Sequence, residues 1–166
     1  MSTAPAPPTV SPEVLLFLFD FDHRALGLNA AGLTHADSLV PAAPGANCAN
    51  WILGHLIASR STVLTLLGQE PVWNEAQGKP FDDHAAWPDP AAVAVPWESL
   101  LADFETSQER IRAGLATVTA ERLAGLHTAE SKRPRGMQLH FLQFHEAYHI
   151  GQIGLLRRIV GRPGAI

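Results

Sequence analysis

Two histidines four residues apart, His145 and His149, are the residues of this chain best suited to metal chemistry. Residues at this spacing lie on one face of a helix, and the same face carries Leu142, Ile153 and Leu156. A pair of imidazoles on an apolar face is costly unless the ring nitrogens have partners. A shared metal ion would serve both rings. The spacing therefore indicates a metal site, and the alternatives are two surface histidines or two core histidines bonded to the backbone.

A third histidine, His55, offers the additional ligand that a metal site needs. It follows Trp51 by four residues on a largely apolar segment, and the preceding Gly54 would allow a backbone or ligand to approach closely. A catalytic zinc ion typically takes three protein ligands and keeps one position for water. His55, His145 and His149 would together form such a site, although a lone core histidine is more often held by ordinary hydrogen bonds.

Two polar residues near the pair are candidates for catalysis. Glu146 completes a literal His-Glu-x-x-His sequence, the zincin protease motif, but a zincin also needs a strand-bearing domain, and this chain shows no strand pattern. Glu146 remains a candidate general base or a group that supports the ligands. Gln152, three residues after His149, can bond a ligand or a bound water; the alternative is a surface glutamine. Tyr148 is interpreted as an aromatic residue of the core whose hydroxyl reaches a hydrogen-bond partner.

The remaining five histidines are expected to be ordinary. His23, beside two aspartates, could act as an acid or base at a pocket mouth, but an exposed helix-end histidine is the simpler interpretation. His140 lies five residues before His145 and hence on another helix face. The other three fall in predicted loops: His35, His84 and His127.

Four long helices must position these residues. Hydrophobic periodicity and capping signals predict helices over Pro12 to about Ala31, Cys48–Leu67, Trp97–Ala116 and Arg135–Val160, with a short turn at 120–123. Residues 33–44 are expected to form a loop. Residues 68–96 hold five prolines, too many for a long helix. Their aromatic residues suggest a crossover that packs on the domain. The fold class is all-α, a four-helix bundle with a long crossover between the second and third long helices.

Composition narrows the classes of function. The chain has 166 residues, with 12 basic and 16 acidic ones, so a basic nucleic-acid-binding face is not expected. A single cysteine, Cys48, excludes a disulfide framework and a cysteine-based zinc site. No apolar run reaches the roughly 18 residues of a membrane span, and the start resembles no secretion signal. We expect a cytoplasmic protein with a flexible tail (1–11) and one domain (12–166).

Two segments resemble motifs of the DinB-like superfamily, which includes DNA-damage-inducible proteins, YfiT-like proteins and thiol-dependent S-transferases. Residues 142–153, LQFHEAYHIGQI, are similar to its closing-helix motif, and residues 50–56, NWILGHL, to its second-helix motif. The resemblance covers nearly the whole chain. It implies a bundle with a long crossover, a divalent metal held by His55, His145 and His149, and frequent dimers; it fixes no substrate.

Three functions follow as hypotheses. The first is a metal-dependent enzyme that activates water, for hydrolysis, or a low-molecular-weight bacterial thiol, for S-transfer or isomerisation; the resemblance favours the thiol. The second is a non-enzymatic stress-response protein with a structural or vestigial metal site. The third is an interaction module, a homodimer that uses the tryptophan-rich crossover. Imidazole ligands suit zinc and nickel first, with iron and manganese as further options.

Overall fold

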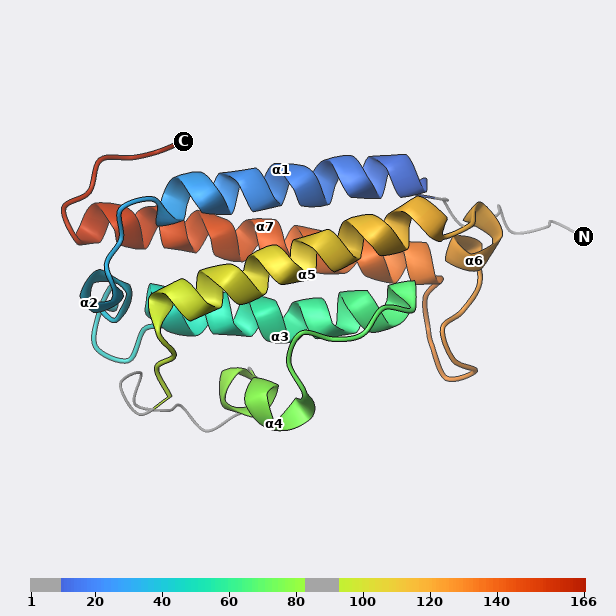
Figure 1. Cartoon of the computed structure of the whole chain (residues 1–166), viewed down its shortest axis with the longest axis horizontal. Coiled ribbons are helices and arrows are strands. Elements are labelled where there is room, and N and C mark those ends of the chain that lie inside the picture. The colour runs from blue at the N-terminus through green and yellow to red at the C-terminus, as the bar shows by residue number, and fades with distance from the viewer. Residues whose placement is uncertain (1–9, 83–92) are drawn as a thin grey trace, which may run out of the picture.

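Four long helices form the protein, as the sequence predicts. The computed structural model describes residues 10–82 and 93–166. The long helices are α1 (Pro12–Ala30), α3 (Ala49–Leu67), α5 (Trp97–Thr117) and α7 (Arg135–Ile159). Figure 1 shows α1 and α7 running one way along the bundle and α3 and α5 running the other way. Since α3 and α5 are parallel, the chain must return along the bundle between them, which confirms the long crossover.

Local sequence signals set the ends of these helices. The Ser11 hydroxyl accepts a hydrogen bond from the Val14 amide at 3.3 Å, and Pro12 occupies the first turn, where its missing N–H costs nothing. Helix α3 ends at Leu67 and is capped by Gly68, whose φ of 75° lies in the left-handed region that favours glycine. The predicted helix ends agree with the observed ones to within one residue.

Four short helical elements complete the described chain. They are α2 (His35–Ser38), α4 (Glu75–Gly78), the 3₁₀ turn η1 (Lys79–Phe81) and α6 (Ala120–Ala124). Only α6 corresponds to a predicted turn. Helix α2 lies in the segment predicted to be a loop, and α4 and η1 lie in the crossover. Reciprocal capping boxes hold α2 and α4, and elements this short leave no hydrophobic period to detect.

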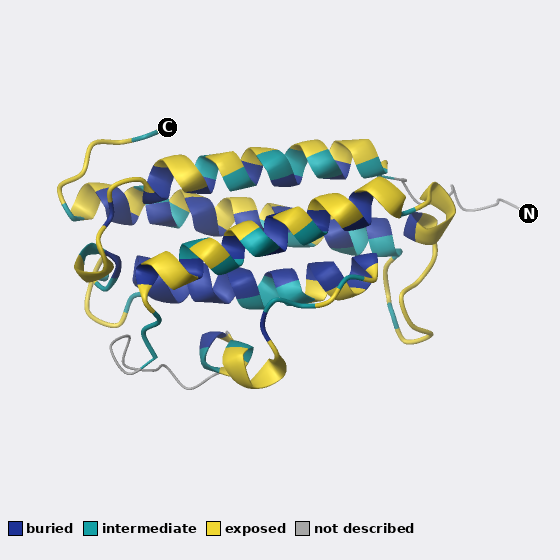
Figure 2. Ribbon diagram, viewed as in Figure 1, coloured by how far each residue is buried: buried dark blue, intermediate teal, exposed yellow. Residues whose placement is uncertain are grey.

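The apolar core runs along the interior of the bundle, and α3 lies deepest in it (Figure 2). Fourteen of the nineteen residues of α3 are buried. The crossover also contributes to the core, because Trp73, Phe81 and Trp97 are each at most 5% exposed. This burial confirms the predicted packing for those three residues. These three side chains are therefore part of the core of the chain itself, whereas Trp87 lies outside the described residues, and the dimer through the crossover stays a hypothesis.

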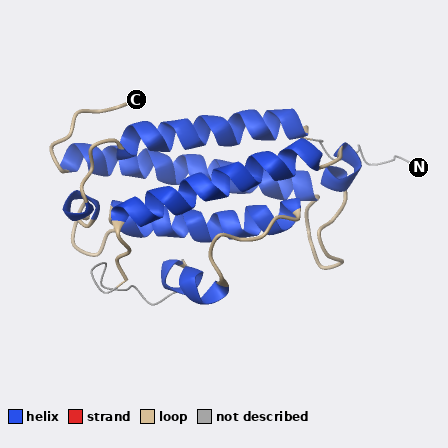
Figure 3. Cartoon of the chain, viewed as in Figure 1, coloured by secondary structure: helices blue, strands red, loops and turns tan. Residues whose placement is uncertain are grey.

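Within residues 10–82 and 93–166 all regular secondary structure is helical (Figure 3). None of these helices combines the length and apolar character that a membrane crossing requires. The predicted N-terminal tail, 1–11, falls almost wholly outside the described residues. The predicted loop position of His84 also falls outside them.

Candidate metal centre

Three histidine side chains converge between α3 and α7. His55 projects from α3, and His145 and His149 project from successive turns of α7. The Nε2 atom of His145 lies 3.1 Å from Nε2 of His55 and 3.0 Å from Nε2 of His149. One ligand atom from each ring falls within 4.8 Å of the other two. The tertiary structure thus brings together the three histidines singled out by the sequence, across 90 residues of chain.

The outer nitrogens of two of these rings are held by acceptors. Nδ1 of His55 donates to the carbonyl oxygen of Phe81 at 2.8 Å, and Nδ1 of His149 donates to Oε1 of Gln152 at 2.7 Å. Because these oxygens only accept, both Nδ1 atoms carry a proton, and the nitrogen left to serve as a metal ligand is Nε2, which faces the cluster. Acceptors placed in this way fix the tautomer of metal-binding histidines.

The spacing of the nitrogens suits one small cation. Nitrogens bound tetrahedrally to a zinc ion at about 2.0–2.1 Å stand about 3.3 Å apart. The two Nε2–Nε2 separations of 3.0 and 3.1 Å approach this value. His55 and His149 are buried and His145 is half-buried. The three residues present therefore fit a divalent metal ion.

The crossover positions His55 because its Phe81 ring packs closely against the backbone of α3 at Gly54. A Cβ atom on Gly54 would overlap the Phe81 ring, so only glycine lets Phe81 pack against α3 at this point. The indole of Trp51 stacks on the His55 ring, with centroids 5.1 Å apart, and its Nε1 donates to the Pro80 carbonyl at 3.3 Å. The 3₁₀ turn that carries Phe81 is thereby fixed against His55.

Glu146 points away from the histidines into a buried ion pair with Arg60 of α3. Arg60 donates Nε to Oε2 of Glu146 at 2.8 Å and Nη2 to Oε1 at 2.6 Å. Its other three N–H groups go to α5: the Phe104 carbonyl, the Ser107 hydroxyl and Oε1 of Gln108. All five guanidinium donors are used, and the group also lies 3.4 Å from the centre of the Phe104 ring. This cluster joins α3, α5 and α7 directly behind the histidines.

A second carboxyl, that of Asp22 on α1, borders the same polar interior. Gln143 donates its Nε2 to Oδ2 of Asp22 at 2.9 Å. Burial, and then the nearby negative charge of Glu146, raise the pKa of Asp22 to about 7. The interior between the helices thus contains the Glu146 carboxylate, paired with Arg60, and the Asp22 carboxyl, whose pKa is raised to about 7.

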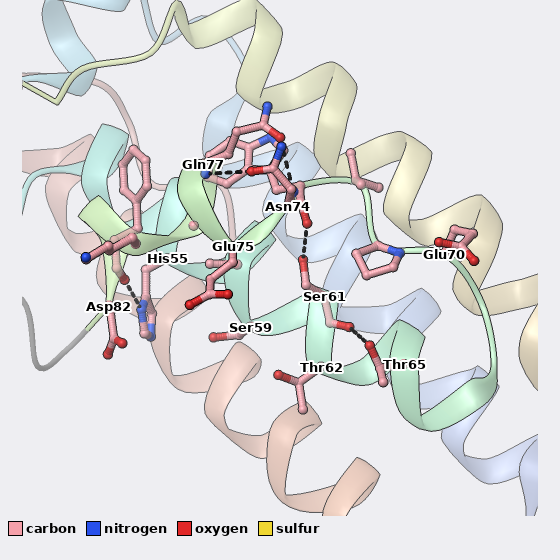
Figure 4. A pocket seen from close by; sticks show the side chains of 17 residues that line it. His55, Ser59, Ser61, Thr62, Thr65, Glu70, Asn74, Glu75, Gln77 and Asp82 are labelled. Atoms are coloured by element: carbon pink, nitrogen blue, oxygen red, sulfur yellow. Dashed lines mark hydrogen bonds between the residues drawn. The ribbon is translucent and has the colours of Figure 1, made fainter.

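A pocket of about 940 Å³ opens beside His55, between α3 and the crossover. His55, Ser59 and Thr62, at spacings of four and three on α3, share the face that forms one wall. Figure 4 shows Glu75 extending from α4 toward Ser59, with His55 and Asp82 at one end and Glu70 at the other. The volume is that of a small-molecule site, and the pocket reaches the histidine cluster through His55.

The other polar residues considered in the sequence are distributed as follows. His23 pairs with Glu105, with Nε2 2.6 Å from Oε2, and is not part of the cluster. His140 is exposed, whereas His35 lies in α2 and not in a loop. The interpretation of Tyr148 as a core residue is wrong: the side chain is 59% exposed, and its hydroxyl accepts from Gln152 Nε2 at 3.3 Å.

Sequence reasoning missed two participants in the site. Arg60 is the only charged residue of α3, so its position in an otherwise uncharged helix was an available signal. The Phe81 carbonyl had no such signal, because any residue type carries a backbone oxygen. Asp22 is one of the two aspartates beside His23 in the sequence, and its contact with Gln143 of α7 exists only in the folded chain.

The arrangement defines a class of protein: an all-α bundle with three histidines that face one another from two helices. A family model for the DinB superfamily matches residues 20–153, and the chain belongs to that superfamily. A conserved protein from Enterococcus faecalis, known from its crystal structure, has the same fold, with a TM-score of 0.72 and 20% identity. The match covers 93% of this chain and 98% of that one. A comparison with curated protein sequences finds no match.

Proposed function

We propose that this protein is a metal-dependent enzyme in which His55, His145 and His149 hold one divalent cation. The observation that carries the proposal is the orientation of the rings, because two of them have Nδ1 on an acceptor and Nε2 toward the shared centre. Neutral imidazoles leave the charge of a cation uncompensated. Zinc and nickel are the metals we expect first, followed by iron and manganese.

The proposed reaction is activation of a low-molecular-weight thiol, in an S-transfer or an isomerisation. A bound divalent cation supplies Lewis acidity that favours the ionised form of a thiol or water. In the S-transfer, the thiol sulfur forms a bond to an electrophilic carbon, the leaving group departs with the electron pair of its bond, and the thiol proton passes to solvent. The pocket beside His55 supports this choice, because it offers room for a small organic molecule next to one of the three proposed ligands.

Glu146 and Gln152 receive different proposed roles. Gln152 contacts His149 directly and orients its ring. Glu146 remains a predicted catalytic residue, but its two bonds to Arg60 favour a positioning role, in which it fixes the turn of α7 that carries His145. To act as a base, Glu146 would have to leave a buried guanidinium.

The test is metal analysis of the purified protein beside alanine variants of the three histidines. We expect one equivalent of metal in the parent protein and loss of it in each of His55→Ala, His145→Ala and His149→Ala. An exchange of His140 to alanine serves as the matched control, since this exposed histidine lies on the same helix. Full metal retention in any of the three variants would remove that residue from the proposed site.

An assay with small thiols and an electrophilic acceptor separates the enzyme from its alternative, a structural or vestigial metal site. A metal-loaded protein that neither binds nor turns over a thiol would support the non-enzymatic function. Thiol consumption that disappears with the metal would support the transferase.

We further propose a homodimer that involves α1 and α7. Both helices expose apolar side chains at spacings of three, four or seven residues: Val14, Phe17, Phe21 and Leu28 on α1, and Phe141, Phe144, Tyr148, Leu155 and Ile159 on α7. This spacing is typical of helices that pack against further helices, and an identical copy presents the same pattern. Phe17, 67% exposed, is the residue to change: Phe17→Glu should convert dimer to monomer in sedimentation velocity.

A further inference from the structure

The pocket beside His55 carries an excess of negative charge. Among the residues that the structure describes, its charged lining consists of Glu70, Glu75 and Asp82 against one cation, Lys79. Neither Glu70 nor Glu75 forms an ion pair with any residue in the described part of the chain. Carboxylates without a protein counter-charge inside a concave surface concentrate cations there.

The remaining polar lining suits hydroxyl and amine groups. Ser59 and Thr62 lie one and two turns beyond His55 on the same face of α3, and Gln77 lies on the crossover side. Figure 4 places Glu75 between these two walls, on the path from the His55 end of the pocket to Glu70. A ligand with one end at the histidines would therefore pass Glu75 before it reaches Glu70.

We infer that this pocket selects a substrate that carries a protonated amine, with hydroxyl groups beside it, and disfavours a carboxylate-bearing one. The inference rests on the proposed function, because it places the reacting thiol of that substrate at the histidine cluster. Glu75 is then the main specificity-determining residue: its carboxylate pairs with the ammonium, while Ser59 and Thr62 contact the hydroxyls. Glu70 acts on longer substrates that reach the far end.

The test uses cobalt(II)-loaded protein and three small thiols that differ in charge: 2-aminoethanethiol, 2-mercaptoethanol and 3-mercaptopropionate. Binding is followed by the sulfur-to-cobalt charge-transfer absorbance, which requires no turnover. Because the three thiols differ in their own acidity, the quantity to compare is the affinity ratio of the cationic to the anionic thiol in parent and variant. Comparing this ratio between parent and variant cancels the differences in acidity among the thiols.

Glu75→Gln should lower this ratio by about three- to tenfold, the range expected for one charge a few ångströms away in a solvated site. Glu70→Gln should lower it less. Glu121→Gln on α6, an exposed residue outside the pocket, is the control with the same change of net charge and should leave the ratio unchanged. The effect of Glu75→Gln should shrink as salt is added.

The outcomes separate the two proposals. Absence of cobalt binding, or of a thiol-dependent spectrum with all three thiols, would refute the proposed function. Thiol spectra with the same affinity ratio in the parent and in Glu75→Gln would overturn the pocket inference alone. A higher affinity for the anionic thiol in the parent than in Glu75→Gln would also overturn it. Helical circular dichroism and cobalt stoichiometry confirm that each variant is folded and loaded.

Discussion

Replacing Glu146 by glutamine is the sharpest test of how the bundle supports its histidines. The change keeps the shape of the side chain but removes the charge and one of the two acceptor oxygens that face Arg60. The pair is nearly inaccessible to solvent, with side-chain exposures of 1% for Arg60 and 3% for Glu146. Water therefore cannot replace the lost partner, and a buried guanidinium remains without its counter-charge.

The expected cost is large for a domain of this size. Breaking a buried ion pair by removing one partner costs about 3–5 kcal/mol. Folded domains have a total stability of about 5–15 kcal/mol. At about 2–4 °C per kcal/mol, the melting temperature should fall by about 6–20 °C. The three bonds from Arg60 to α5 remain, so the figure belongs to the Glu146 pair alone.

Chemical denaturation of the metal-free protein measures this cost without interference from metal binding. Glu105→Gln, which breaks the partly exposed pair with His23, is the control and should change the stability by no more than about 1 kcal/mol. If Glu146→Gln unfolds like the parent, yet abolishes a metal-dependent reaction, the positioning role is refuted and Glu146 acts as a catalytic base. A stability loss with a proportionate fall in metal affinity supports the positioning role.

Three further predictions follow from the contacts around the site. Gly54→Ala should displace the Phe81 ring and so weaken metal affinity about 10–100-fold, by loss of the oriented carbonyl, in a chelator competition. Gln152→Leu should lower metal affinity by a similar factor, whereas Gln152→Glu should retain it because an acceptor for His149 remains; equal losses would contradict this. Asp22, with its pKa raised from 3.8 to about 7, keeps in the folded state a proton that the unfolded chain releases. The free energy of unfolding should therefore fall as the pH rises from about 4 to 7. Asp22→Asn should flatten this part of the curve of stability against pH, and an unchanged slope would refute the assignment.

The sequence alone determined the four long helices and the pair of candidate ligands on α7. Helix periodicity places His145 and His149 on one face whatever the rest of the fold does, because four residues make about one turn. Proline density likewise excluded a long helix between α3 and α5. The three-histidine hypothesis, with His55 as the third ligand, also came from sequence, and the fold brought its Nε2 within 3.1 Å of that of His145.

Tertiary structure decided what surrounds the site, because those partners come from other elements. Glu146 directly follows the candidate ligand His145 in sequence, but packing of α7 on α3 turns its carboxylate toward Arg60. The acceptor for His55 is the backbone oxygen of Phe81 in the crossover, and a backbone contact cannot be predicted from residue type. The interpretation of Tyr148 as a core residue failed for the same reason: periodicity orders the faces of a helix, and only neighbouring elements decide which faces are covered.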